Sequence, residues 1–133
     1  MGFWRAALDF FGIGAGIGAR AERAAARYLK REAGLRIVAR NYRSGRYETD
    51  IIAYDKKSGC IVFVEVKCRP AYAAVPGFYA AASARKSACL KACARAFLRE
   101  NGASGRSFRF DAVEVNHDGN GNFVAINHFE NYM

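Results

Sequence analysis

Two carboxylates and a lysine stand beside apolar runs in the middle of the chain. The segment Cys60–Cys68 reads CIVFVEVKC, so Glu65 and Lys67 follow four consecutive apolar residues. Asp50 stands in the preceding segment, directly before two isoleucines. Because side chains alternate along a strand, Glu65 and Lys67 share one face. A hairpin turn over residues 55–59 would bring Asp50 opposite or diagonal to Glu65.

This arrangement suits a divalent cation. Burying two neighbouring carboxylates is unfavourable unless something compensates their charge, and hard oxygen ligands are those that Mg²⁺ or Mn²⁺ prefers. We therefore predict that Asp50 and Glu65 are metal ligands. Lys67 would be catalytic, either by orienting the attacking water or by neutralising charge on a phosphate group. The alternative is an exposed strand end with Asp50 paired to an arginine, which accounts for each residue singly but not for the set.

A further carboxylate, Glu22, lies on a predicted helix at the border of the apolar stripe that Ala25 and Leu29 form. From there it could reach the same site as an outer ligand or a catalytic base. It could equally be a solvated residue near the positive end of the helix dipole. The residues alone leave both interpretations open.

The elements that must position these residues follow from hydrophobic periodicity and turn signals. Short turns between the first three strands predict antiparallel neighbours, and a helix before the fourth strand predicts a parallel pair. The expected fold class is therefore α/β, with a central mixed five-stranded sheet flanked by helices. The predicted helices are Ala19–Glu32 and Ala81–Glu100, and the predicted strands are Leu35–Asn41, Tyr47–Tyr54, Cys60–Cys68, Ser107–Val115 and Phe123–Asn127.

The charge balance indicates a polyanionic partner. The 133 residues include 21 Lys and Arg against 12 Asp and Glu, a formal net charge of +9. Nucleic acid is the polyanion that such a balance favours, and arginine matches phosphate oxygens bidentately. The 4 cysteines lack CxxC spacing, so a zinc site is not expected. We expect a cytoplasmic protein whose cysteines are reduced.

The first 17 residues form an apolar, glycine-rich segment, expected to be either disordered or a short amphipathic helix. Asp9 interrupts it, and the uncharged run Phe10–Ala19 is too short to span a bilayer, so no membrane partner is expected. Residues 18–133 are expected to form a single domain.

An ordered set of motifs across the chain resembles the YraN family of small bacterial proteins. The family's central glycine-glutamate-isoleucine-aspartate pattern is matched by Glu48 and Asp50, with Tyr47 and Thr49 in place of the glycine and the isoleucine. Tyrosine tolerates fewer backbone conformations than glycine, which leaves the geometry around Glu48 open. The other matching motifs are ERAAARYL at 22–29, IVARNYR at 37–43, VFVEVK at 62–67 with Arg69, RFD at 109–111 and INHFEN at 126–131.

The resemblance implies a fold and a function. YraN proteins are predicted endonucleases related to archaeal Holliday junction resolvases, which implies a restriction-endonuclease-like fold and metal-dependent cleavage of DNA. Carried over by position, it makes Asp50 and Glu65 metal ligands and Lys67 the catalytic lysine, with Glu22 and Glu48 as further catalytic residues. The expected nucleic-acid contacts are Arg20, Arg23, Arg27, Arg43, Arg69 and Lys86.

Two functions of different classes are compatible with these residues. The first is a Mg²⁺- or Mn²⁺-dependent endonuclease on branched or flapped DNA, with a homodimer by analogy to resolvases. The second is a non-catalytic nucleic-acid-binding or assembly protein, which the departures from the central pattern favour; RNA is a weaker third partner. We expect His117 and His128 to be surface residues, and Phe108 and Phe110 to belong to the core.

Overall fold

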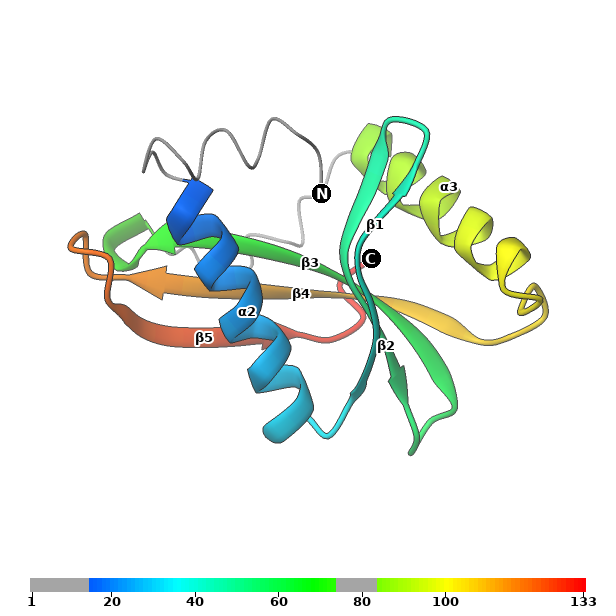
Figure 1. The fold of residues 1–133 in the computed structure, drawn as a ribbon, viewed down its shortest axis with the longest axis horizontal. Coiled ribbons are helices and arrows are strands. Elements are labelled where there is room, and N and C mark those ends of the chain that lie inside the picture. Colours follow the sequence, from blue (N-terminus) through cyan, green and yellow to red (C-terminus); the bar gives the residue numbers. More distant parts are fainter. Residues whose placement is uncertain (1–14, 74–83) are drawn as a thin grey trace.

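The computed structural model describes residues 15–73 and 84–133. Within this part of the chain, no helix is both long and apolar enough to cross a membrane. Figure 1 shows a twisted sheet with one helix against each face. The elements are α2 (Ala15–Arg31), β1 (Arg36–Ser44), β2 (Tyr47–Asp55), β3 (Cys60–Pro70), a 3-10 turn (Ala71–Ala73), α3 (Ala84–Glu100), β4 (Phe108–His117) and β5 (Phe123–Phe129).

The sheet runs in the order β1-β2-β3-β4-β5. The β1–β2, β2–β3 and β4–β5 pairs are antiparallel, and β3 and β4 are parallel, joined by the connection that contains α3. The predicted α/β class with a mixed five-stranded sheet flanked by helices is therefore confirmed. This is the arrangement of a restriction-endonuclease-like fold.

Helix α2 covers one face of the sheet. Ala21, Ala25 and Leu29 recur at a spacing of four residues, which places them on one side of the helix, and they are buried against the valines of β3 and β4. The helix begins at Ala15, four residues before the predicted start at Ala19. It ends before Gly34, whose positive φ of 71° reverses the chain into β1.

Helix α3 covers the other face. Ala94, Phe97 and Leu98 of this helix pack against Phe63 and Phe110 in a second core cluster. The predicted core position of Phe110 is correct. The prediction of a core position is wrong for Phe108, the first residue of β4, which is 41% exposed although its ring contacts those of Phe63 and Phe110 edge to face.

A buried ion network holds the C-terminal segment to β4. Asp111 is fully buried and accepts hydrogen bonds from the Arg109 guanidinium at 3.0 and 3.2 Å and from the backbone N–H of Asn131 at 2.9 Å. His128 Nε2 lies 2.8 Å from Asp111 Oδ2, and its side chain is 6% exposed, so the prediction of a surface residue is wrong for His128. Burial alone would raise the pKa of Asp111, but the hydrogen bonds from His128 and Arg109 outweigh it and hold that pKa below its usual range.

Candidate active site

The candidate site lies where β2 and β3 separate. These strands pair from Asp55↔Cys60 up to Ile51↔Val64, so Asp50 is the first residue beyond the ladder, in register with Glu65. Its carboxylate takes the place of a strand carbonyl, because Asp50 Oδ2 accepts a hydrogen bond of 2.8 Å from the backbone N–H of Val66. A backbone donor that loses its strand partner is thereby satisfied by a side chain.

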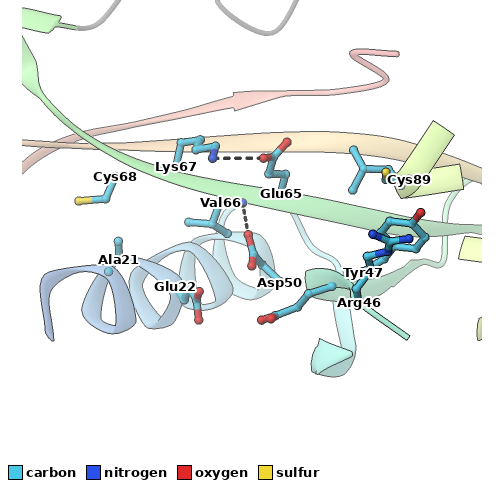
Figure 2. Close-up of a pocket in the computed structure, with 13 residues that line it drawn as sticks. Ala21, Glu22, Arg46, Tyr47, Asp50, Glu65, Val66, Lys67, Cys68 and Cys89 are labelled. Atoms are coloured by element: carbon cyan, nitrogen blue, oxygen red, sulfur yellow. Dashed lines mark hydrogen bonds and ion pairs between the residues drawn. The ribbon is translucent and has the colours of Figure 1, made fainter. Parts of the chain in front are cut away.

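Strand β2 turns over as it leaves β3. Strict alternation would place Asp50 on the same face as Ile52, which packs under α3. Figure 2 instead shows the Asp50 side chain directed toward Glu22 of α2. On the other side, Thr49 is buried and its Oγ1 donates to Sγ of Cys93 in α3 at 3.3 Å. We call the place where β2 and β3 separate the fork. The twist of β2 places Asp50 on the α2 side of the fork.

Burial and neighbouring carboxylates set the charge state of Asp50. Desolvation is the largest effect and, with the negative charges of Glu22, Glu65 and Glu48, it raises the pKa of Asp50 to about 7, against the lowering effect of the hydrogen bond from Val66. A carboxyl group that is half ionised at neutral pH is in a local environment short of positive charge. Such strongly perturbed groups cluster at functional sites.

Two further carboxylates, Glu22 of α2 and Glu48 of β2, lie near Asp50, and we call Glu22, Glu48, Asp50 and Glu65 the acidic lining. Glu22 is only 6% exposed, because it directly follows Ala21 on the buried side of α2. Glu48 stands on β2 and forms an ion pair of 3.2 Å with Arg43 of β1. The interpretation of Glu22 as a solvated surface residue is therefore wrong.

Glu65 and Lys67 point from β3 away from Asp50 (Figure 2). Lys67 Nζ lies 3.5 Å from Glu65 Oε1. Glu65 Oε2 accepts a hydrogen bond of 3.1 Å from the hydroxyl of Tyr132, whose own backbone N–H donates to the carbonyl of Phe110. The C-terminal segment thus contacts the site through Glu65. Sequence reasoning missed Tyr132, since no motif spacing links it to β3.

All five predicted catalytic and ligand residues line one pocket of about 430 Å³. Its walls come from the first turns of α2, the start of β2, the middle of β3 and the N-terminal half of α3. The lining residues are Gly18, Ala21, Glu22, Arg46, Tyr47, Glu48, Asp50, Glu65, Val66, Lys67, Cys68, Cys89 and Leu90.

The donor set fits a hard divalent cation. Carboxylate oxygens are the groups that Mg²⁺ and Mn²⁺ prefer. The raised pKa of Asp50 indicates that a nearby cation would stabilise its ionised form. Within residues 15–73 and 84–133, no three Asp, Glu, His or Cys side chains already converge on one point. A cation held by both Asp50 and Glu65 would therefore require the Glu65 carboxylate to turn from Tyr132 toward the fork.

Tyr47 does not disturb the entry into β2. The turn before it takes its positive φ, 60°, at Gly45, and Tyr47 is extended and paired with Ser44. The conformations that only glycine adopts readily are not needed at position 47. Glu48 accordingly pairs in register with Arg43 of β1.

Several of the predicted nucleic-acid contacts are engaged within the protein. The Arg20 guanidinium donates to the carbonyl of Gly121 at 2.8 Å and lies over the ring of Phe123. Arg69 Nε lies 3.7 Å from Glu114 Oε2, and Arg43 pairs with Glu48. Arg23 and Arg27 line a shallow hollow beside Arg20 on the outer side of α2. Lys86 belongs to the first turn of α3, and its side chain lies outside those described.

Comparison with known proteins places these residues in a family. The sequence profile described as uncharacterised protein family UPF0102 matches residues 21–115. A UPF0102 protein of Pelotomaculum thermopropionicum is 35% identical over 121 residues, covering 86% of this chain and 92% of the relative. Relatives in Beutenbergia cavernae and Mycolicibacterium gilvum are 42% identical over 100 residues and 36% identical over 116 residues, covering 74% and 87% of this chain and 80% and 92% of their own. The region that the profile matches, 21–115, contains the whole acidic lining and Lys67, but not Tyr132.

Proposed function

The chain belongs to the UPF0102 family, which is the YraN family, and from this premise we propose that it is a metal-dependent endonuclease that hydrolyses phosphodiester bonds in DNA. The observation that carries the proposal is the position of Asp50, whose pKa is about 7 and whose neighbours include Glu22, Glu48 and Glu65. Asp50 is partly buried beside three other carboxylates, of which Glu48 and Glu65 pair with Arg43 and Lys67. Burying an ionised carboxylate beside like charges is destabilising. A pocket that does so is suited to binding a divalent cation.

Each residue of the pocket has a separate role in the proposed hydrolysis. Asp50 and Glu65 would hold Mg²⁺ or Mn²⁺, which when bound supplies Lewis-acid catalysis and lowers the pKa of water. Lys67 is partly exposed beside Glu65, so its ammonium group can neutralise charge on the phosphate. Glu22 and Glu48 line the same pocket and can accept a proton from the attacking water.

The proposed substrate is DNA with a branched or flapped structure. The resemblance to resolvases supports this choice, and the net charge of +9 supports binding to phosphates. Contacts to phosphates carry no sequence information and so suit recognition by shape. Paired cuts in two strands would require a homodimer, in which symmetry supplies a second pocket.

The test compares the wild type with Asp50→Asn on labelled linear duplex, flap, single-stranded and four-way-junction DNA, in Mg²⁺, Mn²⁺ or EDTA. We expect cleavage that needs the metal and falls about 100-fold or more in the variant, while binding to DNA persists. The matched control is Asp118→Asn, which removes the same charge from the exposed β4–β5 turn.

Two results would redirect the proposal. Undiminished cleavage by Asp50→Asn would refute the assignment of the site. Binding by the wild type without cleavage of any substrate would favour the non-catalytic nucleic-acid-binding function instead.

A further inference from the structure

The outer face of α3 carries a row of positive charge, which we call the α3 row. Lys91, Arg95 and Arg99 stand four residues apart, and each is exposed. Residues at this spacing are neighbours on one helix face, roughly 5–6 Å apart between Cβ atoms. None of the three has a hydrogen bond or ion pair with the residues that the structure describes.

The α3 row is not arranged for helix stability. Like charges four residues apart destabilise an isolated helix, whereas alternating signs would stabilise it. Glu100 is the only acidic residue of α3. It accepts a hydrogen bond of 2.7 Å from the Tyr42 hydroxyl, on the side of the helix that faces β1. The α3 row thus presents one sign of charge to its surroundings.

Helix α3 connects the candidate pocket to a second hollow. Cys89 and Leu90 line the candidate pocket, and Phe97 and Asn101 line a hollow of about 480 Å³ beyond the other end of the helix. At ~1.5 Å per residue, the distance from Leu90 to Asn101 is roughly 17 Å along the axis. This corresponds to about five base steps of one DNA strand.

The second hollow has a cationic rim of its own. The guanidinium groups of Arg36 and Arg106 lie 5.6 and 5.5 Å from the centre of the Tyr54 ring, and both arginines are exposed. Arg106 Nη2 also donates a hydrogen bond of 3.5 Å to the Tyr54 hydroxyl. A guanidinium group held over an aromatic ring still has further N–H groups that can bind phosphate oxygens. Two cations held on one ring form a natural place for an anion.

We propose that the α3 row and the Arg36–Arg106 pair form a track for the DNA phosphate backbone, leading from the candidate pocket to the far end of α3. The inference rests on the proposed function and adds to it the path of the substrate. It assigns the contacts with DNA phosphates to α3 rather than to α2, because Arg20 of α2 already donates a hydrogen bond to the β4–β5 turn. Charge complementarity and the two flanking hollows are its basis.

The experiment measures binding of a fluorescent 30-base-pair duplex in EDTA over a series of salt concentrations. The test variant is Lys91→Glu/Arg95→Glu/Arg99→Glu, with circular dichroism to verify folding. The control, Arg40→Glu/Lys56→Glu/Lys57→Glu, changes the net charge equally at exposed positions of β1 and the β2–β3 turn. We expect the slope of log affinity against log salt to fall by roughly 3 in the test variant only.

Each outcome has one meaning. Equal losses in both triple variants, or no loss in the test variant, would overturn the α3 track while leaving the nuclease proposal standing. A wild type that binds no DNA would remove the proposed function and the track together. Arg36→Glu/Arg106→Glu should also weaken binding at least tenfold, and an unchanged affinity would exclude the second hollow from the track.

Discussion

At the scale of single residues, the pKa of Asp50 makes a prediction about stability. This pKa is about 7 in the folded chain and ~3.9 in an unfolded one. The folded state therefore binds more protons between these values, and the free energy of unfolding must fall as the pH rises from about 4 to about 7.

Asp50→Asn removes that loss, because the amide oxygen can still accept the hydrogen bond from Val66 but cannot ionise. We predict that the variant is more stable than the wild type at pH 8, by up to a few kcal/mol (~1.4 kcal/mol per pKa unit). The difference should vanish near pH 4. Urea denaturation in EDTA measures both values, and equal stabilities at pH 8 would show that Asp50 ionises without cost.

Tyr132 supplies the second residue-scale prediction. Its hydroxyl and Lys67 hold the Glu65 carboxylate on the side away from Asp50. Tyr132→Phe removes one of these contacts, so Glu65 turns more readily and the affinity for Mn²⁺ should rise about 2- to 10-fold, the equivalent of one hydrogen bond. Calorimetric titration measures the change. Weaker binding by the variant would mean that the hydroxyl supports Glu65 in its ligating position.

At this scale, residue patterns predicted which side chains meet at the candidate site, but not how the folded strands orient them. The apolar runs of β2 and β3 sufficed to choose Asp50, Glu65 and Lys67, which the structure brings to one pocket, while their roles remain predictions. Alternation could not foresee that β2 turns over beyond Ile51. Nor could it find Tyr132, which is 67 residues from Glu65 and reaches it only through the folding of the C-terminal segment.

At the scale of elements, the buried network of Asp111 joins β4 to the chain terminus. Its lowered pKa means that its contribution to stability is present above about pH 4 and is lost as the pH falls further. Asp111→Asn removes the buried anion that pairs with His128 and Arg109, while Arg109 keeps its ion pair of 3.0 Å with Asp55. We therefore expect a loss of about 2–5 kcal/mol at pH 7. The difference between variant and wild type should shrink below pH 3. A loss that is the same at both pH values would indicate packing rather than charge.

The elements themselves were largely predictable, because each strand has a branched apolar core and a turn at its end. The start of α2 was not. Because glycine is a poor helix former, the helix was predicted to start only at Ala19, after Gly16 and Gly18. The helix nevertheless runs through both, and Gly18 lines the candidate pocket. Tertiary packing of the neighbouring Ala21 and Ala25 outweighs the local preference. The predictions for residues 1–14 and for the first residues of the predicted helix Ala81–Glu100 fall outside the described residues, which are 15–73 and 84–133.

At the scale of the whole molecule, the fold explains why an acidic site can exist in a basic protein. The sheet separates two apolar clusters, and the pocket at the fork between β2 and β3 is lined by the first turns of α2 and by Cys89 and Leu90 of α3. Carboxylates gather inside the fork, and arginines and lysines occupy the outer faces of α2 and α3. The fold class followed from the order of the elements. The depth of the fork did not, since it depends on how far β2 departs from β3.

The central claim is that this fork binds a divalent cation through Asp50. Calorimetric titration of Mn²⁺ into the wild type and into Asp50→Asn tests it without any substrate. We predict one saturable site in the wild type, and a loss of at least about tenfold in affinity in the variant. A wild type that takes up no Mn²⁺, or a variant that binds it equally well, would contradict the account.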